Sequence, residues 1–170
     1  MRKFRHLLML LSLLLLLLFP IIGCSKAPPE LGTLYPATIT VTDKGTPLEG
    51  VLVSLVNKEI QTPRGCSALT NSAGVAKITT NIGSYTGKGV VAGNYRVTLF
   101  KMVTFPPELQ GGEEELTLPE NERKEREKKR SEFIENNRII PPLLESRTSS
   151  PIELTVEKKS TVLTIDLSQY

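Results

Sequence analysis

Few side chains in this sequence are suited to covalent or acid–base chemistry. The chain of 170 residues has two cysteines, Cys24 and Cys66, and one histidine, His6. Histidine can act as a general base or a metal ligand, and cysteine becomes a nucleophile when a base activates it. Because His6 lies in a basic N-terminal segment that precedes a long apolar run, a chain that loses this segment keeps no imidazole. Catalysis of the Cys-His or Ser-His-Asp type is then excluded.

Cys24 stands at the end of a segment typical of export signals. Residues 1–6 are basic, residues 7–19 form an apolar run, and residues 20–23 lead to Cys24. A membrane-spanning helix needs ~20 apolar residues, and this run approaches that length only if residues 20–23 are included. The sequence therefore predicts that residues 1–23 are a signal peptide that is removed on export.

The residues Ile21-Ile22-Gly23-Cys24 resemble the lipobox of bacterial lipoproteins, in which a small residue directly precedes an obligatory cysteine. This resemblance implies that Cys24 receives a diacylglycerol on its sulfur, becomes the N-terminus after cleavage, and is then acylated with a chain such as palmitate. Ser25 implies sorting to an outer membrane, or otherwise retention at the cell membrane. The alternatives are an ordinary secretory signal and an uncleaved anchor. If Cys24 is acylated, Cys66 has no cysteine partner, and we expect a half-buried structural thiol.

Charge argues against nucleic acid as a partner. The whole chain has a formal charge of +3, and Arg2, Lys3 and Arg5 account for that excess. The predicted mature chain is therefore neutral. Neutral proteins lack the clustered cationic charge that binds a phosphate backbone and releases its counterions.

Most of the chain after residue 36 alternates apolar and polar residues with a period of two, which is typical of strands with one buried face. The alternation is clear around Ile39, Val53, Val97, Leu154 and Ile165. Seven such segments with turn residues between them predict an all-β fold, a seven-stranded antiparallel β-sandwich over residues 37–168. Residues 24–36 contain three prolines, and we expect them to form an extended tether.

One stretch departs from the strand pattern. Residues 104–150 are predicted to be an insertion before the last two strands, with a helix at about residues 118–138. Thr117 is expected to cap this helix, and Glu120 and Lys124 form one of several i,i+4 pairs. Residues 120–135 hold six acidic and six basic side chains, so we expect a solvated spacer helix. A partner contact through mixed charge and a contact with anionic lipid are the alternatives.

Four short motifs resemble the carboxypeptidase-regulatory-like domain, also called transthyretin-like, of small bacterial lipoproteins. They are GTPLEGVLV from residue 45, TNSAG from residue 70, VAGNYRV from residue 91, and Ile140-Pro141 followed by SSPI from residue 149. The resemblance covers most of residues 37–103 and 139–168 and implies a transthyretin-like or immunoglobulin-like sandwich, with Tyr95 filling it. Asn71 and Leu143-Leu144 depart from the family pattern. None of the motifs supplies an acid, a base or a metal ligand, so they indicate a fold and no activity.

From these observations we expect a lipid-anchored, non-catalytic module of the cell envelope that is structural or binds a protein or a glycan. No cofactor or metal is expected. The alternative is a hydrolase that uses carboxylates alone, with Asp43, Asp166 or Glu49 as candidates. A calcium site is not expected, because a loop of closely spaced acidic ligands is missing from the sequence. Residues 113–115, all glutamate, are expected to form a solvated loop, and Glu59 is expected at the surface.

Overall fold

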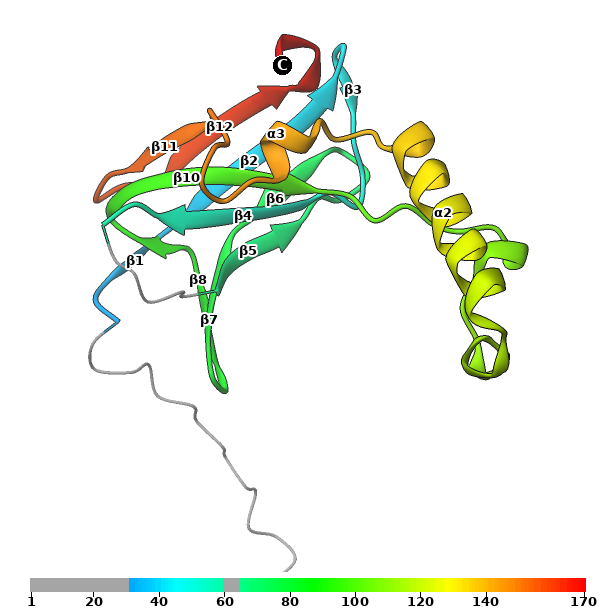
Figure 1. Cartoon of the computed structure of the whole chain (residues 1–170). Coiled ribbons are helices and arrows are strands. Elements are labelled where there is room, and N and C mark those ends of the chain that lie inside the picture. The colour runs from blue at the N-terminus through cyan, green and yellow to red at the C-terminus, as the bar shows by residue number, and fades with distance from the viewer. Residues whose placement is uncertain (1–30, 60–64) are drawn as a thin grey trace, which may run out of the picture.

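The chain folds into a β-sandwich that carries a helical arm at one end. The computed structural model describes residues 31–59 and 65–170, so the predicted signal peptide and Cys24 lie outside the described residues. Figure 1 shows two layers of strands, with helix α2 standing away from both. The predicted all-β sandwich with one charged helical insertion is confirmed.

The larger layer is a six-stranded antiparallel sheet in the order β11-β10-β4-β5-β7-β8. Its strands are β4 (Leu52–Asn57), β5 (Gly65–Leu69), β7 (Thr79–Ile82), β8 (Tyr85–Lys88), β10 (Gly93–Phe100) and β11 (Glu153–Val156). The alternation predicted along β10 buries Tyr95, Val97 and Leu99 against the other layer. The intervening side chains therefore lie on the outer face of this sheet.

The smaller layer is built around β2 (Ala37–Asp43), which pairs with three strands. These partners are β3 (Thr46–Pro47), β6 (Val75–Lys77) and β12 (Thr161–Asp166). Ile39, Val41 and Ile165 point inward and are almost fully buried. The core thus lies between the two layers, where the apolar faces of both sheets meet.

One pairing differs from the predicted antiparallel arrangement. β12 pairs with β2 in parallel, with Thr161 opposite Ala37 and Asp166 opposite Thr42. The reason is the path of the chain. β11 runs antiparallel to β10 in the larger layer, and the chain then turns back, so that β12 enters the smaller layer in the direction opposite to β11. Since β2 starts at the same end of the sandwich as β12, the two strands run in the same direction.

The described residues hold more strands than the seven that were predicted, namely twelve. Three of them, β1 (Leu34–Tyr35), β3 and β9 (Val90–Val91), have only two residues each and are too short to show an alternation. In addition, the chain from Val75 to Ile82 forms two strands, β6 and β7, which belong to different sheets. Ile78, between them, donates its N–H to the carbonyl oxygen of Ala37 at 2.9 Å.

The packed part of the chain begins earlier than the expected residue 37. Leu31 is buried, and β1 pairs with β9 in an antiparallel two-residue ladder. Part of the expected tether is therefore attached to the sandwich. We call this end, where β1 and β9 adjoin the first residue of β10, the β1 end.

The insertion contains two short 3₁₀ helices and two α-helices. They are η1 (Pro107–Leu109), η2 (Glu113–Thr117), α2 (Glu120–Asn137) and α3 (Pro142–Glu145). α2 lies within the expected range and buries none of its residues. The N-cap residue of α2 is Pro119 and not the predicted Thr117, and Pro119 itself makes no side-chain hydrogen bond to the helix. Proline fixes a backbone φ suited to a helix start, so the helix begins without a polar cap.

α3 has a different role from α2. It packs on β10 and buries Leu144 completely. A further 3₁₀ helix, η3 (Leu167–Gln169), ends the fold after β12. In the part of the chain that the structure describes, no helix is both long enough and apolar enough to span a membrane.

Candidate binding surface

Of the two cysteines, only Cys66 lies within the residues that the structure describes. It lies on β5 and is 6% exposed, so it is more deeply buried than the predicted half-buried thiol. Its Sγ lies 3.4 Å from Oγ1 of Thr80 on the neighbouring strand β7. A thiol held in the core in this way is a packing group, in agreement with the structural role expected for it.

Asp166 is a structural carboxylate. Its Oδ1 accepts hydrogen bonds from the backbone N–H of Lys44 at 3.0 Å and from the N–H and hydroxyl of Ser168, and its Oδ2 accepts from the N–H of Gly45 at 2.9 Å. The hydroxyl of Thr42 also lies 3.1 Å from Oδ2. These hydrogen bonds, those from Ser168 first, hold the pKa of Asp166 far below its usual range. The carboxylate therefore joins the β2–β3 turn to η3 and has its acceptor positions occupied.

The other candidates for carboxylate chemistry do not form a cluster. Asp43 ends β2, and Glu49 and Glu59 are exposed. Glu59 accepts a hydrogen bond from the side-chain amide of Asn94 at 3.1 Å. Among residues 31–59 and 65–170, no group of three or more His, Cys, Asp or Glu side chains is placed to hold a metal ion.

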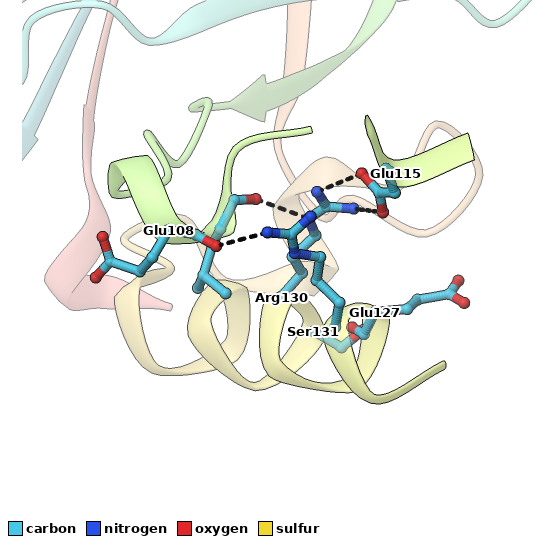
Figure 2. A network of polar contacts seen from close by, with 7 residues as sticks. Glu108, Glu115, Glu127, Arg130 and Ser131 are labelled. Atoms are coloured by element: carbon cyan, nitrogen blue, oxygen red, sulfur yellow. Dashed lines mark hydrogen bonds and ion pairs between the residues drawn. The ribbon is translucent and has the colours of Figure 1, made fainter. Parts of the chain in front are cut away.

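The helical arm, which we define as η1, η2 and α2, is held together by Arg130. Its guanidinium donates to both carboxylate oxygens of Glu115, at 2.6 and 2.8 Å, and its Nε donates to the carbonyl oxygen of Leu109 at 2.7 Å. Arg126 adds a longer hydrogen bond to the carbonyl oxygen of Glu108 (Figure 2). The solvated loop expected for residues 113–115 is thus wrong for Glu115, which belongs to η2 and is ion-paired. The sequence carried no local signal for this contact, since the two partners are 15 positions apart.

This ion pair shifts the pKa of both side chains. The hydrogen bond from Arg130 lowers the pKa of Glu115, and the same bond raises the pKa of Arg130. A two-point Arg–carboxylate contact is geometrically specific, because the planar guanidinium matches the carboxylate. The arm is therefore a hairpin in which this ion pair joins α2 to η2, and α2 buries none of its residues, in agreement with the expected solvated helix.

Elsewhere, α2 presents charge to solvent. The predicted i,i+4 pairs Glu120–Lys124 and Glu125–Lys129 form at 2.7 and 2.8 Å, and both are well exposed. Exposed pairs of this kind contribute little to the stability of a helix, because solvent and salt screen them. The arm thus offers a surface of mixed sign with an acidic excess, since η1, η2 and α2 together hold ten acidic and six basic side chains.

Large apolar side chains are exposed in two places near the end of β10, on the outer face of the larger sheet and along a groove beside the arm. Leu69, Leu52 and Phe100 lie opposite one another across β5, β4 and β10, on the outer face of the larger sheet. Met102 follows Phe100 by two residues, and it lines a groove of about 270 Å³ together with Ile139 and Phe133. The ring of Phe133 lies 5.9 Å from that of Phe105, centroid to centroid, which attaches the arm to the residues after β10. We call the exposed set Leu69, Phe100, Met102 and Ile139 the apolar belt.

The sequence contained a signal for the exposure of Phe100. The alternation that buries Tyr95, Val97 and Leu99 places Phe100 on the outer face. Met102 and Ile139 lie outside any strand or helix, so no periodicity predicts which side they face. Their proximity depends on the return of the chain through the arm.

The belt and the β1 end lie at opposite ends of the sandwich. β1 pairs with β9, which adjoins Gly93 at the start of β10, whereas the belt begins at Phe100 at its other end. At ~3.3 Å per residue, the eight residues of β10 separate these ends by roughly 23 Å. Figure 1 shows the same arrangement, with β1 on the left and the arm on the right.

Fold and surface together define an all-β sandwich domain with an attached helical arm. No family model matches the chain, and no curated protein matches it. Among solved structures, the chain is similar to BcpA, the major pilin subunit of Bacillus cereus, with a TM-score of 0.39 and 13% sequence identity. The similarity covers 79% of this chain and 30% of the pilin, so the chain spans less than a third of that protein. A likeness of this size carries no argument about shared function.

Proposed function

We propose that the chain is a lipid-anchored, non-catalytic module of the bacterial cell envelope that is attached through Cys24 and binds a partner protein or glycan at its arm end. The observation that carries this proposal is the separation of the two ends. The chain that leads back to Cys24 joins the sandwich at Leu31, beside the β1 end, whereas the apolar belt and the arm lie at the other end of β10.

Chain length supports the orientation. Leu31 follows Cys24 by seven positions, and a fully extended chain covers at most ~3.5 Å per position, or about 25 Å in total. A domain anchored at Cys24 therefore stays close to the membrane at its β1 end. Its arm end is then free to face other envelope components.

Membership of the carboxypeptidase-regulatory-like family is part of the proposal. It is supported by the roles of the motif residues. The hydroxyl of Thr70 donates to the carbonyl oxygen of Leu48 at 2.6 Å, and Asn71 Oδ1 accepts from the N–H of Ala73 and of Val75, each at 3.0 Å. Tyr95 fills the core and donates its hydroxyl to the carbonyl oxygen of Val91 at 2.7 Å. These contacts form turns and fill the core, which suits a binding or structural module.

A hydrolase that uses carboxylates alone is not favoured. Asp166 has its acceptor positions occupied by structural hydrogen bonds, and Glu49 is exposed. We expect no turnover when the purified chain is assayed against a broad panel of hydrolase substrates. Turnover that is lost in Asp43→Asn or Glu49→Gln would overturn the non-catalytic assignment.

The anchor is tested by labelling. In a bacterial host that grows with labelled palmitate, the chain should incorporate the label and sediment with membranes. Cys24→Ser should remove both properties, and Cys66→Ala, which changes the buried cysteine, should leave them unchanged. Labelling that persists in Cys24→Ser would rule out the anchor.

The partner is tested by crosslinking the anchored chain in cells and identifying what is recovered. One stoichiometric protein would support assembly, and recovered glycan would support recognition of a carbohydrate. A chain recovered without either would contradict the binding role.

A further inference from the structure

We propose that the outer edge of β12 is a docking site for an extended segment of a partner protein, which adds to the smaller sheet as a further strand. This edge is a different surface from the arm end of the proposed function, and its role needs neither the anchor nor the arm. The edge selects its partner by one property, an extended backbone.

β12 is an outer strand of the smaller sheet. Among residues 31–59 and 65–170 it pairs only with β2. Thr161 donates its N–H to the carbonyl oxygen of Pro36 at 2.9 Å, so the backbone groups of Thr161 face β2. Successive residues of a strand direct these groups to opposite sides, so the N–H and C=O groups of Val162 and Thr164 point away from β2. Within the described ranges, no strand lies on that side to bind them.

This row of backbone groups determines what can cover the edge. An extended chain offers one donor and one acceptor per residue at the same rise of ~3.3 Å, so it matches the row along its whole length. A glycan or a lipid headgroup can bind one of these groups but has no such repeat. The chemistry of the edge therefore favours a polypeptide in a strand conformation.

The other sheet edges of the described residues are short, charged or covered. β1, β3 and β9 have only two residues each, and β6 has three. β11 carries Glu153, and a Cβ atom at Gly87 of β8 would lie 2.3 Å from the side chain of Leu34, which covers that strand. β12 has six residues, no proline and no charge before Asp166 at its end. Since natural proteins protect their open edges by these devices, the unprotected edge of β12 indicates a strand that is used for pairing.

The side chains beside the edge indicate the composition of the added strand. Val162 is 70% exposed, and Thr164 is exposed as well. The register with β2 places Thr38 next to Val162 and Thr40 next to Thr164. Pairs of β-branched side chains across neighbouring strands are favourable. We therefore expect the partner segment to be rich in valine, isoleucine or threonine and to lack proline.

A second copy of the chain fits this edge less well than a single segment. Two β12 strands that pair antiparallel are related by a two-fold axis perpendicular to the sheet, so the larger layers of both copies also approach each other. β11, at the edge of the larger layer, leads into β12 through residues 157–160. A second copy must therefore fit against both layers, whereas one extended segment needs room at β12 alone.

The test selects short random peptides, displayed on phage, against the purified full chain in detergent. We expect the selected peptides to alternate β-branched and polar residues, and to bind Thr164→Ala as they bind the unchanged chain. Thr164→Pro should weaken binding about tenfold or more, because proline removes the N–H that faces the added strand and spares the ladder with β2. Selection of no peptide, or equal binding to Thr164→Pro, would overturn the proposal.

Amide exchange measured by NMR shows where a selected peptide binds. With the peptide present, the N–H groups of Val162 and Thr164 should exchange about tenfold more slowly, since they become hydrogen-bonded. The N–H of Thr86, on the edge strand β8, should exchange at an unchanged rate. A peptide that binds without protecting Val162 and Thr164 would contradict strand addition.

A second variant keeps the test decisive if Thr164→Pro does not fold. Val162→Lys changes an exposed side chain and gives the edge the charge that protected edges carry, so it should weaken peptide binding about tenfold. Leu116→Lys is the matched control, because Leu116 is 82% exposed on the arm. Circular dichroism of each variant reports whether it has folded. Undiminished binding to a folded Val162→Lys chain would refute the docking site.

The same samples distinguish a second copy from a different chain. We expect the purified chain to be monomeric in analytical ultracentrifugation, with its β12 edge open. A dimer that is lost in Thr164→Pro would show that a second copy occupies the edge, and the assignment to a different chain would then be wrong.

Discussion

In the helical arm, the guanidinium of Arg130 binds both carboxylate oxygens of Glu115, at 2.6 and 2.8 Å, and so joins α2 to η2. About four-fifths of each side chain is covered, which makes this the least exposed ion pair among the described residues. The attachment of η2 to α2 is therefore made by residues 15 positions apart in the chain.

Replacing Arg130 should loosen the arm without unfolding the sandwich. In Arg130→Ala, Glu115 and the carbonyl oxygen of Leu109 lose their donor, so we expect the backbone amides of η1 and η2 to exchange on the order of tenfold faster. Hydrogen exchange with mass spectrometry measures this. Lys124→Ala breaks an exposed pair on the same helix and should leave the exchange of η1 and η2 unchanged. Exchange that is unaffected in Arg130→Ala would show that the arm is held by other contacts.

Leu143 and Leu144 offer a matched pair of substitutions. Leu144 of α3 is fully buried where this helix packs on β10, whereas Leu143 next to it is 50% exposed. We expect Leu144→Ala to lower the free energy of unfolding by about 2–5 kcal/mol, because it leaves a cavity against β10. Leu143→Ala should cost less than about 1 kcal/mol. Urea unfolding of both variants measures the difference, and equal losses would contradict the packing of α3.

A second matched pair concerns the turn before β6. Gly74 has φ of +72°, and a Cβ atom there would lie 2.5 Å from the carbonyl oxygen of Val41. Gly45 has φ of +79° and no atom within 4 Å of such a Cβ. We expect Gly45→Ala to cost about 1–2 kcal/mol from the backbone conformation alone, and Gly74→Ala to cost clearly more. Thermal unfolding of the two variants compares them, and a Gly74→Ala chain as stable as Gly45→Ala would refute the close approach.

Asp166 should make stability depend on acid pH. Its pKa is lowered in the folded state, so its contribution is fully present above the unfolded pKa of ~3.9 and is lost as pH falls through the folded value. Asp166→Asn should therefore melt several degrees lower at pH 6, and its difference from the unchanged chain should shrink toward pH 2. Asp43→Asn removes the same charge at the end of β2 and should have a smaller effect. A difference that stays constant from pH 6 to pH 2 would contradict the hydrogen-bonded carboxylate.

Much of the sandwich was predictable, because in a strand with one buried face the alternation of apolar and polar residues indicates which side chains are buried. Val97 and Ile165 alternate with polar neighbours, and both are buried as the period of two requires. The composition of residues 118–138 likewise predicted α2, since charged residues with i,i+4 spacing favour a helix. Strands of two residues and the parallel pairing of β12 with β2 were not predictable, because neither leaves a local pattern.

For the candidate surface, too, some features follow from the sequence and others only from the tertiary structure. By itself, the sequence determined the predicted neutrality of the mature chain, the two cysteines and the residues that form the turns, since each of these follows from residue type and local spacing. Only the tertiary structure decided that Glu115 pairs with Arg130, that Leu144 is buried while Leu143 is exposed, and that Met102 and Ile139 share one groove. These contacts join segments far apart in the chain. They depend on where the arm returns to the sandwich, and no local propensity encodes that position.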